Sequence, residues 1–283
     1  MLVVSHSNLY DAFFDHSAFS INTLARNIFL NKDVKQLVSK KYVELLENRI
    51  LDKNQFQALI TELFDQNRIV SIPPNNGSSL EDEYIHLSTT PLTNQPLTLS
   101  ITLQEDNILE QKVANIFVLS KAKKPNIHWV IKELASKSSC TVNHFDFKTD
   151  SEIKFFIDSV IAIPKYIRQA QVFDREVSPK YKDKLKGFHI DYYTLGKGMP
   201  IIDLLDKKKE IRRALGGRLK LWYTKKTSII HERKILFENI IITSDNSFNN
   251  IAISDPTWQL NIQYSPDDIA KWLSKCIDFI ECK

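Results

Sequence analysis

Short apolar runs alternate with amphipathic segments from about residue 106 to the C-terminus, and this alternation limits the fold more than any other feature. The period-two and apolar runs predict strands over 114–120, 141–147, 169–177, 189–195, 218–224, 229–237 and 239–243. Helical spacing predicts helices over 126–138, 151–163, 202–215 and 265–280. Elements in this order are typical of an α/β or α+β sheet domain. We therefore expect one α/β or α+β sheet domain over residues 106–283.

The first 72 residues have a different pattern. Apolar residues recur at mostly helical spacing over 31–51 and 54–69, which predicts amphipathic helices. Pro73 and Pro74, followed by Asn and Gly, end any helix, and Pro91 and Pro96 favour extended segments after them. We expect a helical N-terminal domain over residues 1–72, whose helices bind a protein partner, and an extended linker over residues 73–105.

The composition excludes several classes of protein. No apolar run in the 283 residues approaches the ~18 needed to cross a membrane, and the first residues lack the pattern of a secretory signal. The three cysteines, Cys140, Cys276 and Cys282, have no metal-binding spacing, and the six glycines form no phosphate-binding loop. We expect a cytoplasmic protein without a cofactor or a structural metal.

Positive charge is concentrated between Lys180 and Lys234. This segment holds 12 lysines and four arginines against four aspartates and two glutamates, a net charge of +10, so that the rest of the chain carries −6. Either an anionic partner or a solvated lysine-rich surface explains such a segment. For a nucleic-acid partner, the residues expected to neutralise phosphates are Lys207, Lys208, Lys209, Arg212, Arg213, Arg218, Lys220, Lys225 and Lys226.

Charged residues interrupt the apolar run over residues 229–237. Side chains alternate faces along a strand, so His231 and Arg233 share one face, while Glu232 and Lys234 share the other. Burying unpaired charge is expensive, which indicates that this strand uses its charges.

The order of residues around His231 resembles the HKD motif of the phospholipase D-like superfamily, H-x-K-x4-D followed by a turn with Ser and Asn. Arg233 stands at the motif lysine, Glu238 at its aspartate, and Ser247 and Asn249 at the turn. The resemblance implies a phospholipase D-like mixed sheet, a histidine that attacks phosphorus, and a cation that holds the phosphate oxygens. Members of the superfamily use two such motifs, whereas this chain has one.

The single motif leaves three alternatives. A homodimer that brings two His231 side chains together would form a metal-independent phosphodiesterase or nuclease. The motif is also similar to the H-D-R-x-I core of a degenerate phospholipase D-like domain in some trafficking proteins, which implies a non-catalytic component that binds nucleic acid or protein in a larger assembly, such as a host-defence assembly. In the third alternative, His231 has no functional role.

Glu232 and Lys234 also form the E-x-K of metal-dependent PD-(D/E)xK nucleases. Asp191 or Asp174 would supply the second carboxylate for Mg²⁺ in that alternative. Asp174, Arg175 and Glu176 could instead supply phosphate contacts at the mouth of the same sheet or form a surface ion pair.

Overall fold

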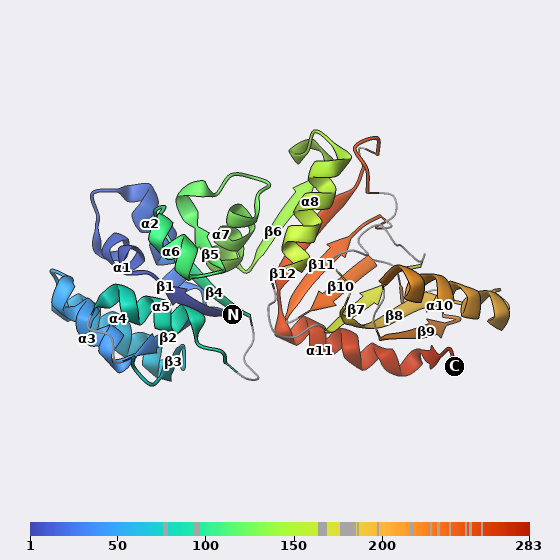
Figure 1. The fold of residues 1–283 in the computed structure, drawn as a ribbon, viewed down its shortest axis with the longest axis horizontal. Coiled ribbons are helices and arrows are strands. Elements are labelled where there is room, and N and C mark those ends of the chain that lie inside the picture. The colour runs from blue at the N-terminus through green and yellow to red at the C-terminus, as the bar shows by residue number, and fades with distance from the viewer. Residues whose placement is uncertain are drawn as a thin grey trace. The chain divides into compact units, whose positions relative to one another are not determined.

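The computed structural model divides into two compact units, Met1–Ser138 and Ser139–Lys283 (Figure 1). It describes residues 1–75, 79–92, 97–163, 169–175, 185, 187–196, 198–215, 218–226, 228–230, 233–237, 239–246, 248, 251–255 and 257–283, without the side chains of residues 214 and 215. The expected domain limits at residues 72 and 105 both fall inside the first unit.

The N-terminal unit contains a five-stranded parallel sheet in the order β3-β2-β1-β4-β5. Its strands are β1 (Leu2–Ser5), β2 (Lys35–Ser39), β3 (Ile69–Ile72), β4 (Thr98–Thr102) and β5 (Ile116–Val118). Its helices are α1 (Ser7–Phe14), α2 (Phe19–Leu30), α3 (Lys40–Arg49), α4 (Lys53–Asp65), α5 (Leu80–Thr89), α6 (Asn107–Lys112) and α7 (Ile127–Lys137), with a 3₁₀ turn η1 (Leu119–Lys121). Helix α2 packs on α7, and α3 packs on α4 and α5 (Figure 1).

This sheet corrects the prediction of a purely helical segment over residues 1–72. Strands β1 and β2 are almost fully buried, because helices cover both faces of a parallel sheet, and such strands read as continuous apolar runs without alternation. The expected linker also supplies a helix and a strand, α5 and β4. Ser39, Asp52 and Ser79 cap α3, α4 and α5 by accepting hydrogen bonds from backbone N–H groups of the first turn.

The C-terminal unit contains a mixed eight-stranded sheet in the order β13-β9-β8-β7-β10-β11-β12-β6. Its strands are β6 (Ser139–Asn143), β7 (Gln169–Phe173), β8 (His189–Leu195), β9 (Leu219–Thr224), β10 (Arg233–Phe237), β11 (Ile240–Ser244), β12 (Gln259–Tyr264) and β13 (Ile280–Glu281). Its helices are α8 (Asp150–Ile161), α10 (Ile201–Leu215) and α11 (Pro266–Ser274), with 3₁₀ turns η2 (His144–Asp146) and η3 (Lys275–Asp278). The mixed sheet flanked by helices agrees with the predicted α/β class.

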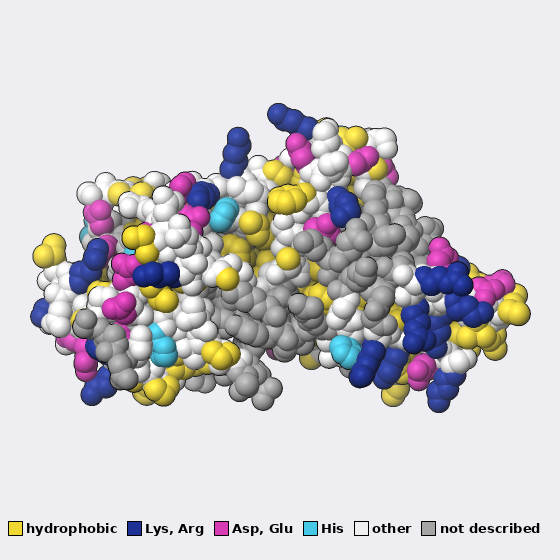
Figure 2. All heavy atoms as spheres, in the orientation of Figure 1, with side chains coloured by type: hydrophobic (Ala, Val, Ile, Leu, Met, Phe, Trp, Pro, Cys, Tyr) yellow, Lys and Arg dark blue, Asp and Glu magenta, His cyan; other side chains and the backbone are white. Residues whose placement is uncertain are grey.

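Two helices cover different parts of this sheet. The core on the α11 side contains Phe173, Tyr193, Leu236 and Phe279, with Trp272 of α11 packed against them. Helix α10 connects β8 to β9 and lies against β9 (Figure 1). Figure 2 shows lysine and arginine side chains gathered over the part of the unit that carries α10 and β9. No described helix is long and apolar enough to span a membrane.

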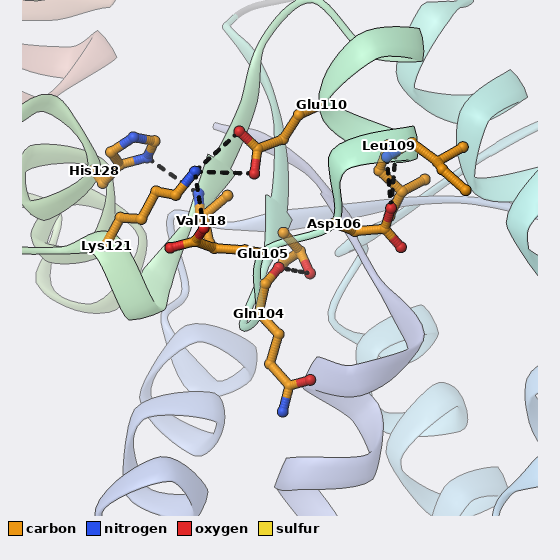
Figure 3. A network of polar contacts seen from close by, with 10 residues as sticks. Gln104, Glu105, Asp106, Leu109, Glu110, Val118, Lys121 and His128 are labelled. Atoms are coloured by element: carbon orange, nitrogen blue, oxygen red, sulfur yellow. Dashed lines mark hydrogen bonds and ion pairs between the residues drawn. The ribbon is translucent and has the colours of Figure 1, made fainter.

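A polar network orders the connection from β4 to α7 in the N-terminal unit (Figure 3). The Lys121 ammonium lies 3.0 Å from both carboxylate oxygens of Glu110 and 3.6 Å from Glu105. His128 Nδ1 accepts a hydrogen bond of 3.1 Å from the backbone N–H of Val118. Burial lowers the pKa of His128, and the nearby Lys121 lowers it further, while Glu110 and Glu105 oppose the shift.

Because the pKa of His128 is lowered in this network, we expect the N-terminal unit to lose stability in mild acid. The pKa of His128 is lower in the folded chain than in the unfolded chain, so the unfolded chain takes up more protons as the pH falls below about 6.5. Burial lowers the pKa of His6 as well, with the same sign. We expect the amides of β5 to exchange faster with deuterium as the pH falls from 7 to 5, after correction for intrinsic exchange rates.

The matched variant for this prediction is His128→Asn, which keeps a hydrogen-bond acceptor but does not titrate. It should flatten the pH dependence at β5 while the response of His6 persists. An unchanged profile in His128→Asn contradicts the assignment.

Candidate functional site at a sheet edge

The best-defined charged site lies where β7 ends and β10 begins. The two strands are antiparallel, with Phe173 opposite Lys234, so the residue after β7 and the first residue of β10 meet at the same edge of the sheet. These residues are Asp174 and Arg233. Strand β8 runs parallel to β7 and ends at the same edge.

Asp174 and Arg233 form a largely buried pair. Arg233 Nε lies 3.9 Å from Asp174 Oδ1, and the two side chains are 19% and 1% exposed. Arg233 also donates through Nη1 to the backbone carbonyl of Asp245, at 3.0 Å, which follows the neighbouring strand β11. The arginine therefore joins three strands and compensates a buried negative charge.

Arg175 fixes the chain on the other side of this pair. Its Nε donates to the carbonyl of Ile230 at 2.7 Å, and its own carbonyl accepts a hydrogen bond of 3.2 Å from Thr194 Oγ1 at the end of β8. Asp174 N–H donates to the carbonyl of Tyr193 at 3.1 Å. Hydrogen bonds thus hold the backbone around Asp174 and the segment before β10 in one arrangement.

Of the HKD-like residues, the structure describes Arg233 alone. His231, Glu238, Ser247 and Asn249 lie outside the described residues. Strand β10 begins at Arg233, whereas the sequence predicted a strand from residue 229. Ile229 lies in a bend, and Ile230 is in irregular structure. The predicted roles of these five residues stay predictions.

The described residues of the E-x-K alternative do not form a metal-binding group. Glu232 is outside them, and Lys234 is buried, with its ammonium 3.1 Å from Thr243 Oγ1 and 4.8 Å from the Trp272 ring centre. Asp191 accepts a hydrogen bond from Trp222 Nε1 at 3.1 Å. The described part of the chain holds no group of three or more His, Cys, Asp and Glu side chains that could bind a metal ion.

The nine basic residues expected to bind nucleic acid lie along α10 and at both ends of β9. Lys207, Lys208 and Lys209 lie in the middle of α10, while Arg212, Arg213, Arg218 and Lys220 lie at its C-terminal end and at the start of β9. Lys225 and Lys226 follow β9 and lie at the edge that carries Asp174. Arg218 and Lys220 therefore lie at the opposite end of β9 from Lys225 and Lys226. The role of all nine residues in binding nucleic acid stays a prediction.

Three of these cations are bonded to other residues of the C-terminal unit. Lys208 Nζ donates to the carbonyl of Cys282 at 2.5 Å, Lys209 pairs with Asp206 at 2.9 Å, and Lys226 pairs with Asp278 at 2.5 Å.

Exposed arginines that form no ion pair with another described residue lie at the end of α10 and directly before β9. Arg212, Arg213 and Arg218 are exposed and form no ion pair with any described residue. Lys209 lies three and four residues before Arg212 and Arg213, so the three side chains share one face of α10.

Asp174 is the residue whose role the sequence indicated least well. One expectation for Asp174 was a surface ion pair, but the residue is fully buried. One signal was available, because an acid that directly follows an apolar strand marks the sheet edge where polar groups of several strands meet. Its partner Arg233 could not be identified without the pairing of β7 and β10.

No protein-family model matches the sequence, and no curated protein sequence matches it. Among solved structures, the chain is similar to polyphosphate kinase from Porphyromonas gingivalis, with 14% sequence identity and a TM-score of 0.37 over 81% of this chain. The chain spans only 34% of the length of that kinase. It is also similar to TrmBL2, an archaeal chromatin protein with a novel mode of DNA binding, with 10% identity and a TM-score of 0.31 over 96% of both chains. Such low TM-scores indicate neither a family nor a function.

Proposed function

We propose that the C-terminal unit is a degenerate phospholipase D-like domain that binds the phosphate backbone of nucleic acid and does not cleave it. The observation that carries the proposal is the group of exposed arginines at the end of α10 and the start of β9, Arg212, Arg213 and Arg218. Cations of this kind release counterions from nucleic acid and bind it without reading its sequence.

The state of Arg233 supports binding without catalysis. In the HKD interpretation, the cation at this position must hold the phosphate oxygens of the substrate. Arg233 is instead mostly buried, bonded to the carbonyl of Asp245 and close to the carboxylate of Asp174. A phosphate would have to displace these partners before it could bind to Arg233. A catalytic cation binds its substrate without such a displacement.

The position of the arginines supports the same conclusion. Arg218 precedes β9, and the end of α10 leads into that strand, so these cations lie at the amino end of β9. Asp174 and Arg233 lie at the carboxyl edge of the parallel strands β7, β8 and β9. Nucleic acid on the arginine surface would therefore bind at a distance from the degenerate motif.

Fluorescence anisotropy with a labelled DNA duplex and a labelled RNA strand, at salt concentrations between 50 and 200 mM, tests this proposal. We expect similar affinities for unrelated sequences and a linear fall of log K with log salt. The triple variant Arg212→Gln/Arg213→Gln/Arg218→Gln should bind at least about tenfold more weakly and reduce the salt slope by about one per arginine.

The matched control is Lys32→Gln/Lys53→Gln/Lys148→Gln, which removes three exposed cations outside α10 and β9. Equal losses in the two triple variants would contradict the proposed surface. Incubation of the bound complex in EDTA and then in Mg²⁺ tests the absence of cleavage. Metal-independent cleavage that disappears in His231→Ala would overturn the non-catalytic assignment.

A further inference from the structure

The strand order of the N-terminal unit contains a reversal, and open α/β sheets bind ligands at such a reversal. Strand β1 lies between β2 and β4, and all three are parallel. After β1 the chain forms β2 and β3 on one side of β1, and then β4 and β5 on the other side, so the strand order reverses at β1. Ligands of such sheets bind outside the carboxyl ends of the strands at this reversal. Asn8 joins the two strand ends there, because its amide donates to Thr102 Oγ1 at 2.9 Å and accepts from Leu103 N–H at 3.1 Å.

A cavity of about 560 Å³ lies beside this junction. This volume is within the range of about 300–1,000 Å³ that small-molecule sites occupy. Its apolar wall consists of Ala12, Ala18, Ile21, Leu24, Leu103 and Leu119. Gln104 also lines it, and Figure 3 shows the Gln104 side chain directed away from the network of Lys121 and the two glutamates. The cavity thus has an apolar wall and a few polar groups.

A second hollow of about 600 Å³ adjoins the first, since both are lined by Asp11, Asp15 and Arg49. The second hollow adds Asp52 and His16 to the polar groups and Phe14, Ile50 and Leu51 to the apolar ones. We call the two hollows together the switch-point groove.

Negative charge dominates the switch-point groove. Its arginine, Arg49, is already bound to Asp11, with Nη2 2.7 Å from Oδ2 and Nε 3.2 Å from the same oxygen. Hydrogen bonds from Ser17 lower the pKa of Asp15, so this carboxylate stays ionised at neutral pH. Asp52 adds a third carboxylate, and no lysine is among the described residues that line either hollow. An anionic ligand would meet repulsion here, and a cationic ligand would be attracted.

We infer that the switch-point groove binds an organic cation, an ammonium or guanidinium group on an apolar stem. The cationic group would bind to the carboxylate of Asp15, and the stem would lie along Ile21 and Leu24. The chemistry of the groove fits a free amine and a lysine or arginine side chain of a peptide equally. This site is in the unit that the nucleic-acid proposal does not use, so each can fail alone.

Isothermal titration of the full chain at low salt tests the inference with spermidine and agmatine as free cations and with a short arginine-containing peptide. Inorganic phosphate and adenosine monophosphate serve as anionic probes. We expect at least one cation to bind and neither anion to bind. Asp15→Asn should weaken binding about tenfold, because the neutral amide loses one charge-assisted contact.

Asp65→Asn is the matched control, because Asp65 is an exposed aspartate at the end of α4 that lines neither hollow. It should bind the cation as the unchanged protein does. Binding of a free cation identifies a small-molecule site, and binding of the peptide alone identifies a peptide site. Equal weakening in Asp15→Asn and Asp65→Asn, binding of an anion, or no binding of any cation overturns the inference.

Discussion

Replacing Arg233 by methionine is expected to destabilise the C-terminal unit by about 3–5 kcal/mol, the usual cost of removing one partner of a buried ion pair. The Asp174 side chain is 1% exposed and lies 3.9 Å from Arg233 Nε, so the substitution leaves a buried carboxylate without this compensating charge. It also removes a donor from the carbonyl of Asp245. Methionine keeps the length of the apolar stem, which limits the loss of packing.

Hydrogen exchange of peptides from β7 and β10 measures this effect in the full chain, because it reports the opening free energy of each segment separately. The double variant Arg233→Met/Asp174→Asn removes both charges and should recover most of the loss. Arg175→Met is the matched control, since Arg175 donates to the carbonyl of Ile230 and should cost only about 1 kcal/mol. An Arg233→Met protein as stable as Arg175→Met would show that the pair contributes little and that Asp174 does not hold Arg233 in place.

The elements of the C-terminal unit were predictable where their pattern is local. Strand β8 was predicted with the observed limits, and α10 was predicted to within one residue. The last helix was predicted to begin at Ser265, which caps α11 by accepting a hydrogen bond from Asp268 N–H. Strand β12 was missed, although Leu260, Ile262 and Tyr264 are buried at alternate positions, as period-two patterning requires.

The parallel sheet of the N-terminal unit could not be distinguished from helices by its pattern. A short apolar run such as Leu37 and Val38 in β2 suits a buried strand and a buried helix equally, and the start of α3 directly after β2 lengthens the apparent helix.

The charged site was predicted only in part, because sequence places residues along a strand but does not give the register between strands. The pattern identified Arg233 as a cation in an apolar strand. That Arg233 meets Asp174 follows from the antiparallel pairing of β7 and β10, which pairs segments far apart in the chain. The positions of Lys225 and Arg218 at opposite ends of β9 likewise depend on the direction of that strand, which the sequence pattern does not contain.

Replacing Arg68 by methionine is expected to destabilise the N-terminal unit by about 2–4 kcal/mol, although no chemistry is assigned to this residue. Arg68 is 5% exposed, and its guanidinium donates to the carbonyl of Val34 at 2.9 Å, to the carbonyl of Phe29 and to Gln66 Oε1 at 3.2 Å. The Phe29 carbonyl belongs to the last turn of α2, where carbonyls have no partner within the helix. Burial lowers the pKa of Arg68, and the surrounding carbonyls stabilise the charged group that the fold has buried.

Arg49→Met is the informative comparison for Arg68→Met, because it separates burial from the number of hydrogen bonds. Arg49 makes three close contacts with Asp11, but the two side chains are 53% and 38% exposed, and exposed ion pairs contribute at most about 1 kcal/mol. Hydrogen exchange of peptides from α2, β2 and β3 should therefore accelerate strongly in Arg68→Met and only slightly in Arg49→Met. If the two variants exchanged alike, the backbone carbonyls of Phe29 and Val34 would have found other donors, and Arg68 would not be what joins α2 to the β2 and β3 edge of the sheet.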